Sequence, residues 1–244
     1  MPRRECAFCP STAKLTAEHL WSDWMDSLLP GKKRFIEHNA HGEIVKKWVS
    51  KELNWKAKVV CAECNNTWMS DIEHSHAKPA LADLIIGKLG VPVDPARARS
   101  IATFSFKTAA VFDLISAYHP PFFRKDERYA FRSSLAIPST AKMWIAAFAP
   151  VGKGRVHTGY FQGTTSPANL FRGYVCTFGV EHFVFQLIAV RTSQRLRPAP
   201  GFEHLAVPLW PRFRSFVWPI PWVLNTSQHF EAFSLRWKTV SIVT

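Results

Sequence analysis

The chain has 244 residues, of which 47% are hydrophobic, and this composition excludes an intrinsically disordered protein. Lys and Arg number 31 against 18 Asp and Glu, and the formal net charge of +13 indicates a polyanionic partner such as nucleic acid or an anionic membrane surface, or else a basic surface that only keeps the protein soluble. No apolar run has the length of a signal peptide or of a bilayer span, so we expect a cytoplasmic protein with no membrane partner.

The first 90 residues are predicted to form a unit of their own, which ends where Gly and Pro interrupt the pattern at residues 87–99. In chain order we expect a tight metal-binding turn over 6–14, a helix capped by Thr16 that runs to Leu29, a strand over 57–60 and a helix over 65–89 that breaks near Pro79. His38 and His41 stand in a polar stretch between these elements, which we interpret as a solvated loop.

Residues 91–244 are predicted to form a mixed, largely antiparallel β region with helices. The spacing of apolar residues indicates a helix over 101–118, and aromatic or β-branched runs indicate strands over 143–149, 170–178, 183–190 and 214–218. No motif in this region carries specific chemistry. We expect it to bind substrate, a protein partner or a second copy of the chain.

Four of the five cysteines form two C-x-x-C pairs, Cys6 with Cys9 and Cys61 with Cys64. Each pair places two thiolates on one side of a tight turn, and two such turns supply the corners of a tetrahedral zinc site. A redox dithiol or an iron–sulfur cluster is the alternative, although neither pair lies in a βαβ pattern. Zinc with four sulfur ligands has no open position, so we predict a structural ion. Cys176 is predicted to be a buried core thiol.

Two polar groups flank the cysteine pairs: Glu18-His19 follows the first pair, and Asn65 follows Cys64 directly. A zinc ion that joins the two turns would bring these residues together. An imidazole beside two oxygen ligands suits metal-assisted hydrolysis of a phosphodiester. The alternatives are that Glu18 and His19 form a solvated pair on a helix, and that Asn65 caps the helix that follows it.

The order C-x-x-C, Glu-His and C-x-x-C-Asn resembles the HNH, or His-Me finger, endonucleases, and the layout is similar to that of phage Holliday-junction resolvases. The strings T-x-E-H-x-x-x-x-W from Thr16 and V-C-x-x-C-N-N-x-W-M-S from Val60 are also similar to uncharacterised bacterial and phage HNH proteins. The resemblance covers about the first third of the chain.

This resemblance implies an α+β protein whose N-terminal module, residues 1–90, is a zinc-stabilised ββα-metal (HNH/treble-clef-like) unit. It implies His19 as general base, Glu18 and Asn65 as ligands of a catalytic Mg²⁺ or Mn²⁺, and nucleic acid as substrate, with DNA expected before RNA. The sequence departs from the family twice. Glu18 stands where Asp is usual, and the middle Asn of the family has no counterpart before the second pair, where only Asn54 lies near. These departures favour the alternative of a catalytically inactive zinc finger that binds nucleic acid or protein.

Basic residues surround the proposed site. They stand at positions 32–34, 46, 47, 56 and 58, and others extend past it at 97, 99, 124, 125 and 128. A positive field of this kind gives affinity for phosphate without choice of base sequence. The alternative is an ordinary solvated surface.

Overall fold

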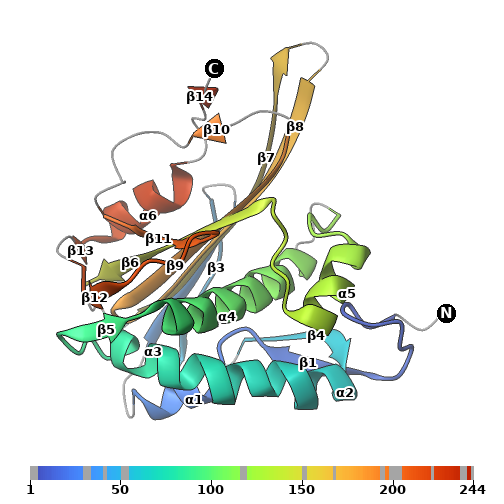
Figure 1. Cartoon of the computed structure of the whole chain (residues 1–244), viewed down its shortest axis with the longest axis horizontal. Coiled ribbons are helices and arrows are strands. Elements are labelled where there is room, and N and C mark those ends of the chain that lie inside the picture. The colour runs from blue at the N-terminus through green and yellow to red at the C-terminus, as the bar shows by residue number, and fades with distance from the viewer. Residues whose placement is uncertain are drawn as a thin grey trace.

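The computed structural model describes residues 5–29, 34–40, 43–50, 55–115, 120–149, 153–166, 169–192, 196–197, 205–220, 223–236 and 241–242. Helix α4, Pro95–Leu114, lies at the centre of the fold (Figure 1). Asp94 caps it by accepting a hydrogen bond from the backbone N–H of Arg97 at 2.7 Å, and Pro95 occupies its first turn. Every residue from 101 to 113 is buried, as expected of a helix that is packed on all sides. The helix predicted over 101–118 is confirmed. It begins earlier, at Pro95, because Asp94 caps it there, and it ends at Leu114.

A twisted eight-stranded sheet packs on one side of α4 (Figure 1). Its order is β11-β6-β9-β8-β7-β2-β3, with β13 beside β6, and all neighbours are antiparallel except the pairs β2–β7 and β13–β6. The strands are β2 Arg34–Ala40, β3 Glu43–Ser50, β6 Ala141–Phe148, β7 Lys153–Ser166, β8 Asn169–Val180, β9 Phe183–Arg191, β11 Val207–Trp210 and β13 Val223–Leu224. The mixed, largely antiparallel α+β architecture is therefore confirmed.

Smaller elements complete the chain. The strand predicted over 214–218 shortens to β12, Phe216–Trp218, which pairs with β5, Val91–Val93, in a separate two-stranded sheet. Strands β10, Leu196–Arg197, and β14, Ser241–Ile242, form another pair. Helix α6, Ser227–Leu235, packs beside β8 on the face opposite α4 (Figure 1). There the side-chain amide of Gln186 donates to the carbonyl oxygen of Phe233 at 2.8 Å.

The β2–β3 hairpin corrects the interpretation of His38 as part of a solvated loop. His38 lies in β2, its Nε2 is 3.1 Å from Oγ1 of Thr158, and its ring packs on Trp55. Burial, followed by repulsion from Lys46, lowers the pKa of His38 to about 4. His41 lies outside the described residues. Since this hairpin joins the large sheet through β7, the first 90 residues share that sheet with the remainder. Whether they fold as a separate unit stays a prediction.

The cysteine-bearing part is built on another antiparallel pair, β1, Leu15–His19, and β4, Lys56–Cys61. The helix predicted from Thr16 to Leu29 is therefore wrong: a strand comes first and the short helix α1, Asp23–Ser27, follows. Pairing with β4 decides this, since the hydroxyl of Thr16 donates to the carbonyl oxygen of Val60 at 3.1 Å instead of capping a helix. The strand predicted over 57–60 is confirmed as β4.

A long helical segment follows β4 directly. It comprises α2, Ala62–Cys64, two π-helical segments at Asn65–Met69 (η1) and Ile72–Ala77 (η2), and α3, Lys78–Ile85. The predicted helix is confirmed, but the break at Pro79 is wrong. Pro79 falls in the first turn of α3, where the register changes after η2 and a missing N–H is tolerated.

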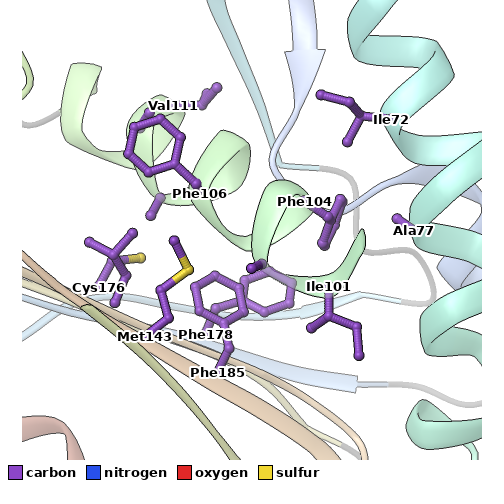
Figure 2. Close-up of a cluster of buried hydrophobic side chains, with 14 of the residues drawn as sticks. Ile72, Ala77, Ile101, Phe104, Phe106, Val111, Met143, Cys176, Phe178 and Phe185 are labelled. Carbon is purple, nitrogen blue, oxygen red and sulfur yellow. The ribbon is translucent and has the colours of Figure 1, made fainter. Parts of the chain in front are cut away.

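One apolar core connects all these layers (Figure 2). Ile72 and Ala77 from η2 face Ile101 and Phe104 of α4, and the opposite side of α4 faces Phe178 and other sheet residues (Figure 2). Cys176 is fully buried in this core, as predicted, and burial raises the pKa of its thiol. In the described part of the chain, no helix carries an apolar stretch that would reach across a bilayer.

Candidate metal centre and the polar cluster beside it

The four predicted ligands Cys6, Cys9, Cys61 and Cys64 lie together and are all buried. Their sulfur atoms are within 4.8 Å of one another, and the Sγ atoms of Cys9 and Cys61 are 3.6 Å apart. A tetrahedral zinc ion with Zn–S bonds of about 2.3 Å requires sulfur atoms about 3.8 Å apart, so the cluster fits this ion. The four thiols are free of disulfides. The prediction of a four-cysteine site able to hold zinc is confirmed.

The backbone around each cysteine pair places the four sulfur atoms close together. The first pair lies in a turn closed by a hydrogen bond from the N–H of Cys6 to the carbonyl oxygen of Ser11, at 2.8 Å. Cys61 is the last residue of β4, and its N–H donates to Sγ of Cys6 at 3.3 Å. Cys64 follows in α2. Burial raises the pKa of the Cys64 thiol. Zinc binding would have to displace the proton of this thiol.

Helix α5, Lys125–Ser134, contacts the chain within both cysteine pairs. The guanidinium of Arg128 donates to the carbonyl oxygen of Ala7, between the first two cysteines, at 2.8 Å. Arg132 pairs with Glu63, between the second two, also at 2.8 Å. Both halves of the metal site are therefore attached to one helix from the second half of the chain.

Asn65 lies next to β1, where the sequence predicted that it would meet the Glu18-His19 pair. Its side-chain Nδ2 donates to Oγ1 of Thr16 at 3.1 Å and to the carbonyl oxygen of Ala17 at 3.3 Å. The alternative of Asn65 as a helix N-cap is wrong. The helical segment begins after Cys61, and Asn65 already has helical backbone angles.

Glu18 points into the protein. Only 3% of its side chain is exposed, and its Oε1 accepts a hydrogen bond from the ammonium group of Lys107 at 2.6 Å. The same ammonium contacts Oε1 of Glu73 at 2.5 Å. Lys107 comes from the middle of α4 and Glu73 from η2, so three distant segments meet in this cluster. The alternative of a solvated Glu18 on a helix surface is wrong.

Electrostatic attraction outweighs burial in this cluster. Burial on its own would lower the pKa of Lys107, but the charges of Glu18 and Glu73 raise it above its ordinary value. Burial would raise the pKa of Glu73, but the Lys107 ammonium group lowers it. The shifts favour the ammonium form of Lys107 and the carboxylate form of Glu73. The charge of His19 also helps to lower the pKa of Glu73, so the imidazole lies within electrostatic range of the cluster.

His19 is the last residue of β1 and remains partly exposed, at 22% of its side chain. Its Nε2 is 2.8 Å from a carboxylate oxygen of Asp23, four residues further along at the start of α1. Lys56 is its direct partner on β4, and residues directly opposite in an antiparallel pair lie on the same face of the sheet. Lys58 follows two residues later on that face, and both lysines are exposed.

The other basic residues have varied surroundings. Arg124 pairs with Asp126, Lys125 pairs with Glu5, and Arg128 donates to backbone carbonyl groups, so these three side chains have partners within the protein. Lys56 and Lys58 form no ion pair with any residue that the structure describes. Among the described residues, Lys56 and Lys58 therefore contribute positive charge on the face of His19.

A divalent ion at Glu18 does not fit the residues present. Among the described residues, the four cysteines are the only group that brings three or more His, Cys, Asp or Glu ligand atoms together. The Oε1 atom of Glu18 already accepts a hydrogen bond from a buried ammonium group. Asn54, the nearest residue to the missing family Asn, lies outside the described residues.

Neither Lys107 nor Glu73 is among the site residues predicted from the sequence. A signal for Lys107 is present, because it is the only charged residue in the helical stretch 101–112. A buried Lys requires a carboxylate partner, but spacing along the chain does not identify it.

The chain was compared with protein-family models, with curated proteins and with solved structures. None of them matches it.

Proposed function

We propose that this protein hydrolyses phosphodiester bonds of nucleic acid, with His19 as the general base. The observation that carries the proposal is the position of His19. His19 ends a strand whose antiparallel partner is β4. Strand β4 ends at Cys61, the first residue of the second cysteine pair, and a helix follows directly. That order of two strands and a helix is what the resemblance to HNH endonucleases implies, and it supports the proposal.

The surroundings of His19 suit a base. When neutral His19 donates from Nε2 to Asp23, its Nδ1 remains an acceptor that can take a proton from water. A carboxylate that holds the imidazole in one orientation is a recurring part of such sites. Lys56 and Lys58 lie on the same face and would neutralise the phosphate and the charge that develops on it. The base, its orienting carboxylate and the positive charges are therefore all side chains of this chain.

A second candidate function is binding of nucleic acid without cleavage. One observation favours it: Lys107 engages Glu18, the residue that the family resemblance assigns to a catalytic metal ion. In this case the zinc-held strands present Lys56 and Lys58 to phosphates, and His19 contributes only contacts.

A cleavage assay with a matched histidine variant tests the proposal. Plasmid DNA and labelled RNA are incubated with zinc-loaded protein, without added metal and with Mg²⁺ or Mn²⁺. We expect His19→Ala to lower the rate about 100-fold to 10,000-fold. His76→Ala is the control, because His76 also lies near an aspartate, Asp71 at 3.6 Å, but on an exposed stretch of η2, and it should leave the rate unchanged.

The remaining outcomes separate the two candidates. Equal cleavage by wild type and His19→Ala would refute the role of His19. Salt-sensitive binding that Lys56→Ala weakens, with no cleavage under any metal condition, would establish the binding function in its place.

A further inference from the structure

We infer that the ammonium group of Lys107 is a built-in cation that takes the place of a divalent metal ion at Glu18. The inference rests on the proposed function for its chemical meaning, because HNH-type hydrolysis assigns a metal ion to this position. The claim about metal binding itself depends only on the geometry of Glu18, Glu73 and Lys107.

The first support is the closeness and burial of the cluster. The ammonium nitrogen lies 2.6 Å from an oxygen of Glu18 and 2.5 Å from an oxygen of Glu73. Lys107 is 1% exposed, and Glu18 and Glu73 are 3% and 13% exposed. An ammonium group is a compact charge with three hydrogen-bond donors, and two of them have carboxylate acceptors here. The ring of Phe104, 5.5 Å from the nitrogen, gives further attraction to the cation.

The second support is that Lys107 cannot leave the cluster easily. It sits in the middle of α4, and every neighbouring residue from 101 to 113 is buried. A divalent ion at Glu18 would need to displace the ammonium group and leave it buried without a partner, or else bind directly beside a like charge. Both arrangements are unfavourable. Mg²⁺ also requires near-octahedral oxygen ligands at about 2.0–2.1 Å, and one oxygen of Glu18 is already occupied.

Metal binding can be measured without any assay of cleavage. Zinc-loaded protein is titrated with Mn²⁺ at neutral pH, and electron paramagnetic resonance of the free aquo ion gives the bound fraction. We expect no stoichiometric Mn²⁺ binding by the wild type. Lys107→Met removes the ammonium group and leaves Glu18 and Glu73 facing each other, so this variant should bind one Mn²⁺ per chain. The double variant Lys107→Met with Glu73→Gln should lose that ion. Lys107→Gln serves the same purpose if the Met variant fails to fold.

Two results would overturn the inference. One is stoichiometric Mn²⁺ binding by the wild type that Glu18→Gln abolishes. The other is a folded Lys107 variant that binds no Mn²⁺, because the ammonium group would then not be what excludes the ion. A protein that never cleaves nucleic acid would still give the expected binding pattern, so failure of the proposed function is distinguishable from failure of this inference.

Discussion

Replacing Lys107 by Met is expected to destabilise the protein strongly. Met keeps the length of the side chain and removes the charge, so two buried carboxylates lose the cation that lies within 2.6 Å of both. Removal of one partner from a buried ion pair costs about 3–5 kcal/mol. The free energy of unfolding of a typical domain is only about 5–15 kcal/mol, so the loss should be evident in any unfolding curve.

The size of this loss should depend on pH. In the wild type, Lys107 lowers the pKa of Glu73 below its ordinary value of 4.5. The stability from this pair is therefore present above pH 4.5 and is lost as the pH falls through the folded pKa. In Lys107→Met the two carboxylates repel each other, and protonation relieves that repulsion. The difference between wild type and variant should therefore narrow as the solution is acidified.

The assay is chemical denaturation followed by circular dichroism, at neutral pH and near pH 4. Lys88→Met is a matched control, since Lys88 pairs with Asp83 at 3.4 Å on the exposed surface. Loss of that pair should change the free energy of unfolding by about 0–1 kcal/mol. A loss below about 1 kcal/mol for Lys107→Met, no larger than that of the exposed pair, would refute the reasoning about the buried cluster.

Two further predictions concern the backbone and the metal. Gly87→Ala should destabilise the protein by more than Gly90→Ala. Both glycines have positive φ, 75° and 72°, so the backbone strain of an Ala is similar at the two positions. A Cβ at Gly87 would collide with the ring of His182, whereas Gly90 faces open space. Backbone strain of about 1–3 kcal/mol is common to both, so similar melting temperatures would contradict the steric argument. Cys64→Ser should abolish zinc binding and lower the melting temperature, while Cys176→Ala should retain one zinc per chain by elemental analysis. Full zinc content in the Ser variant would contradict the four-cysteine site.

The features that could be predicted from sequence are those that local spacing determines. A C-x-x-C turn places its own two sulfur atoms, so the cluster formed by Cys6, Cys9, Cys61 and Cys64 follows from the motif. Strands β6, β8 and β9 are likewise predictable from their runs of aromatic and β-branched residues. The position of Asn65 beside β1 is also predictable, since a metal ion shared by both turns would bring this residue near Glu18 and His19.

Features that depend on pairing across the chain were missed. Residues 16–29 have apolar spacing compatible with a helix, but hydrogen bonds to β4 make residues 15–19 a strand, and Glu18 then faces inward. His38 stands in a polar stretch, yet its strand is stabilised by β7, more than a hundred residues further on. The contact between Lys107 and Glu18 joins α4 to β1 and has no local signature.

A zinc ion held by the four cysteines is the central claim about this site. X-ray absorption at the zinc edge of the purified protein measures the ligand atoms and their distances. We expect four sulfur ligands at about 2.3 Å, as in a closed structural site. A zinc ion with nitrogen or oxygen ligands, or a folded protein that binds no zinc, would contradict this claim.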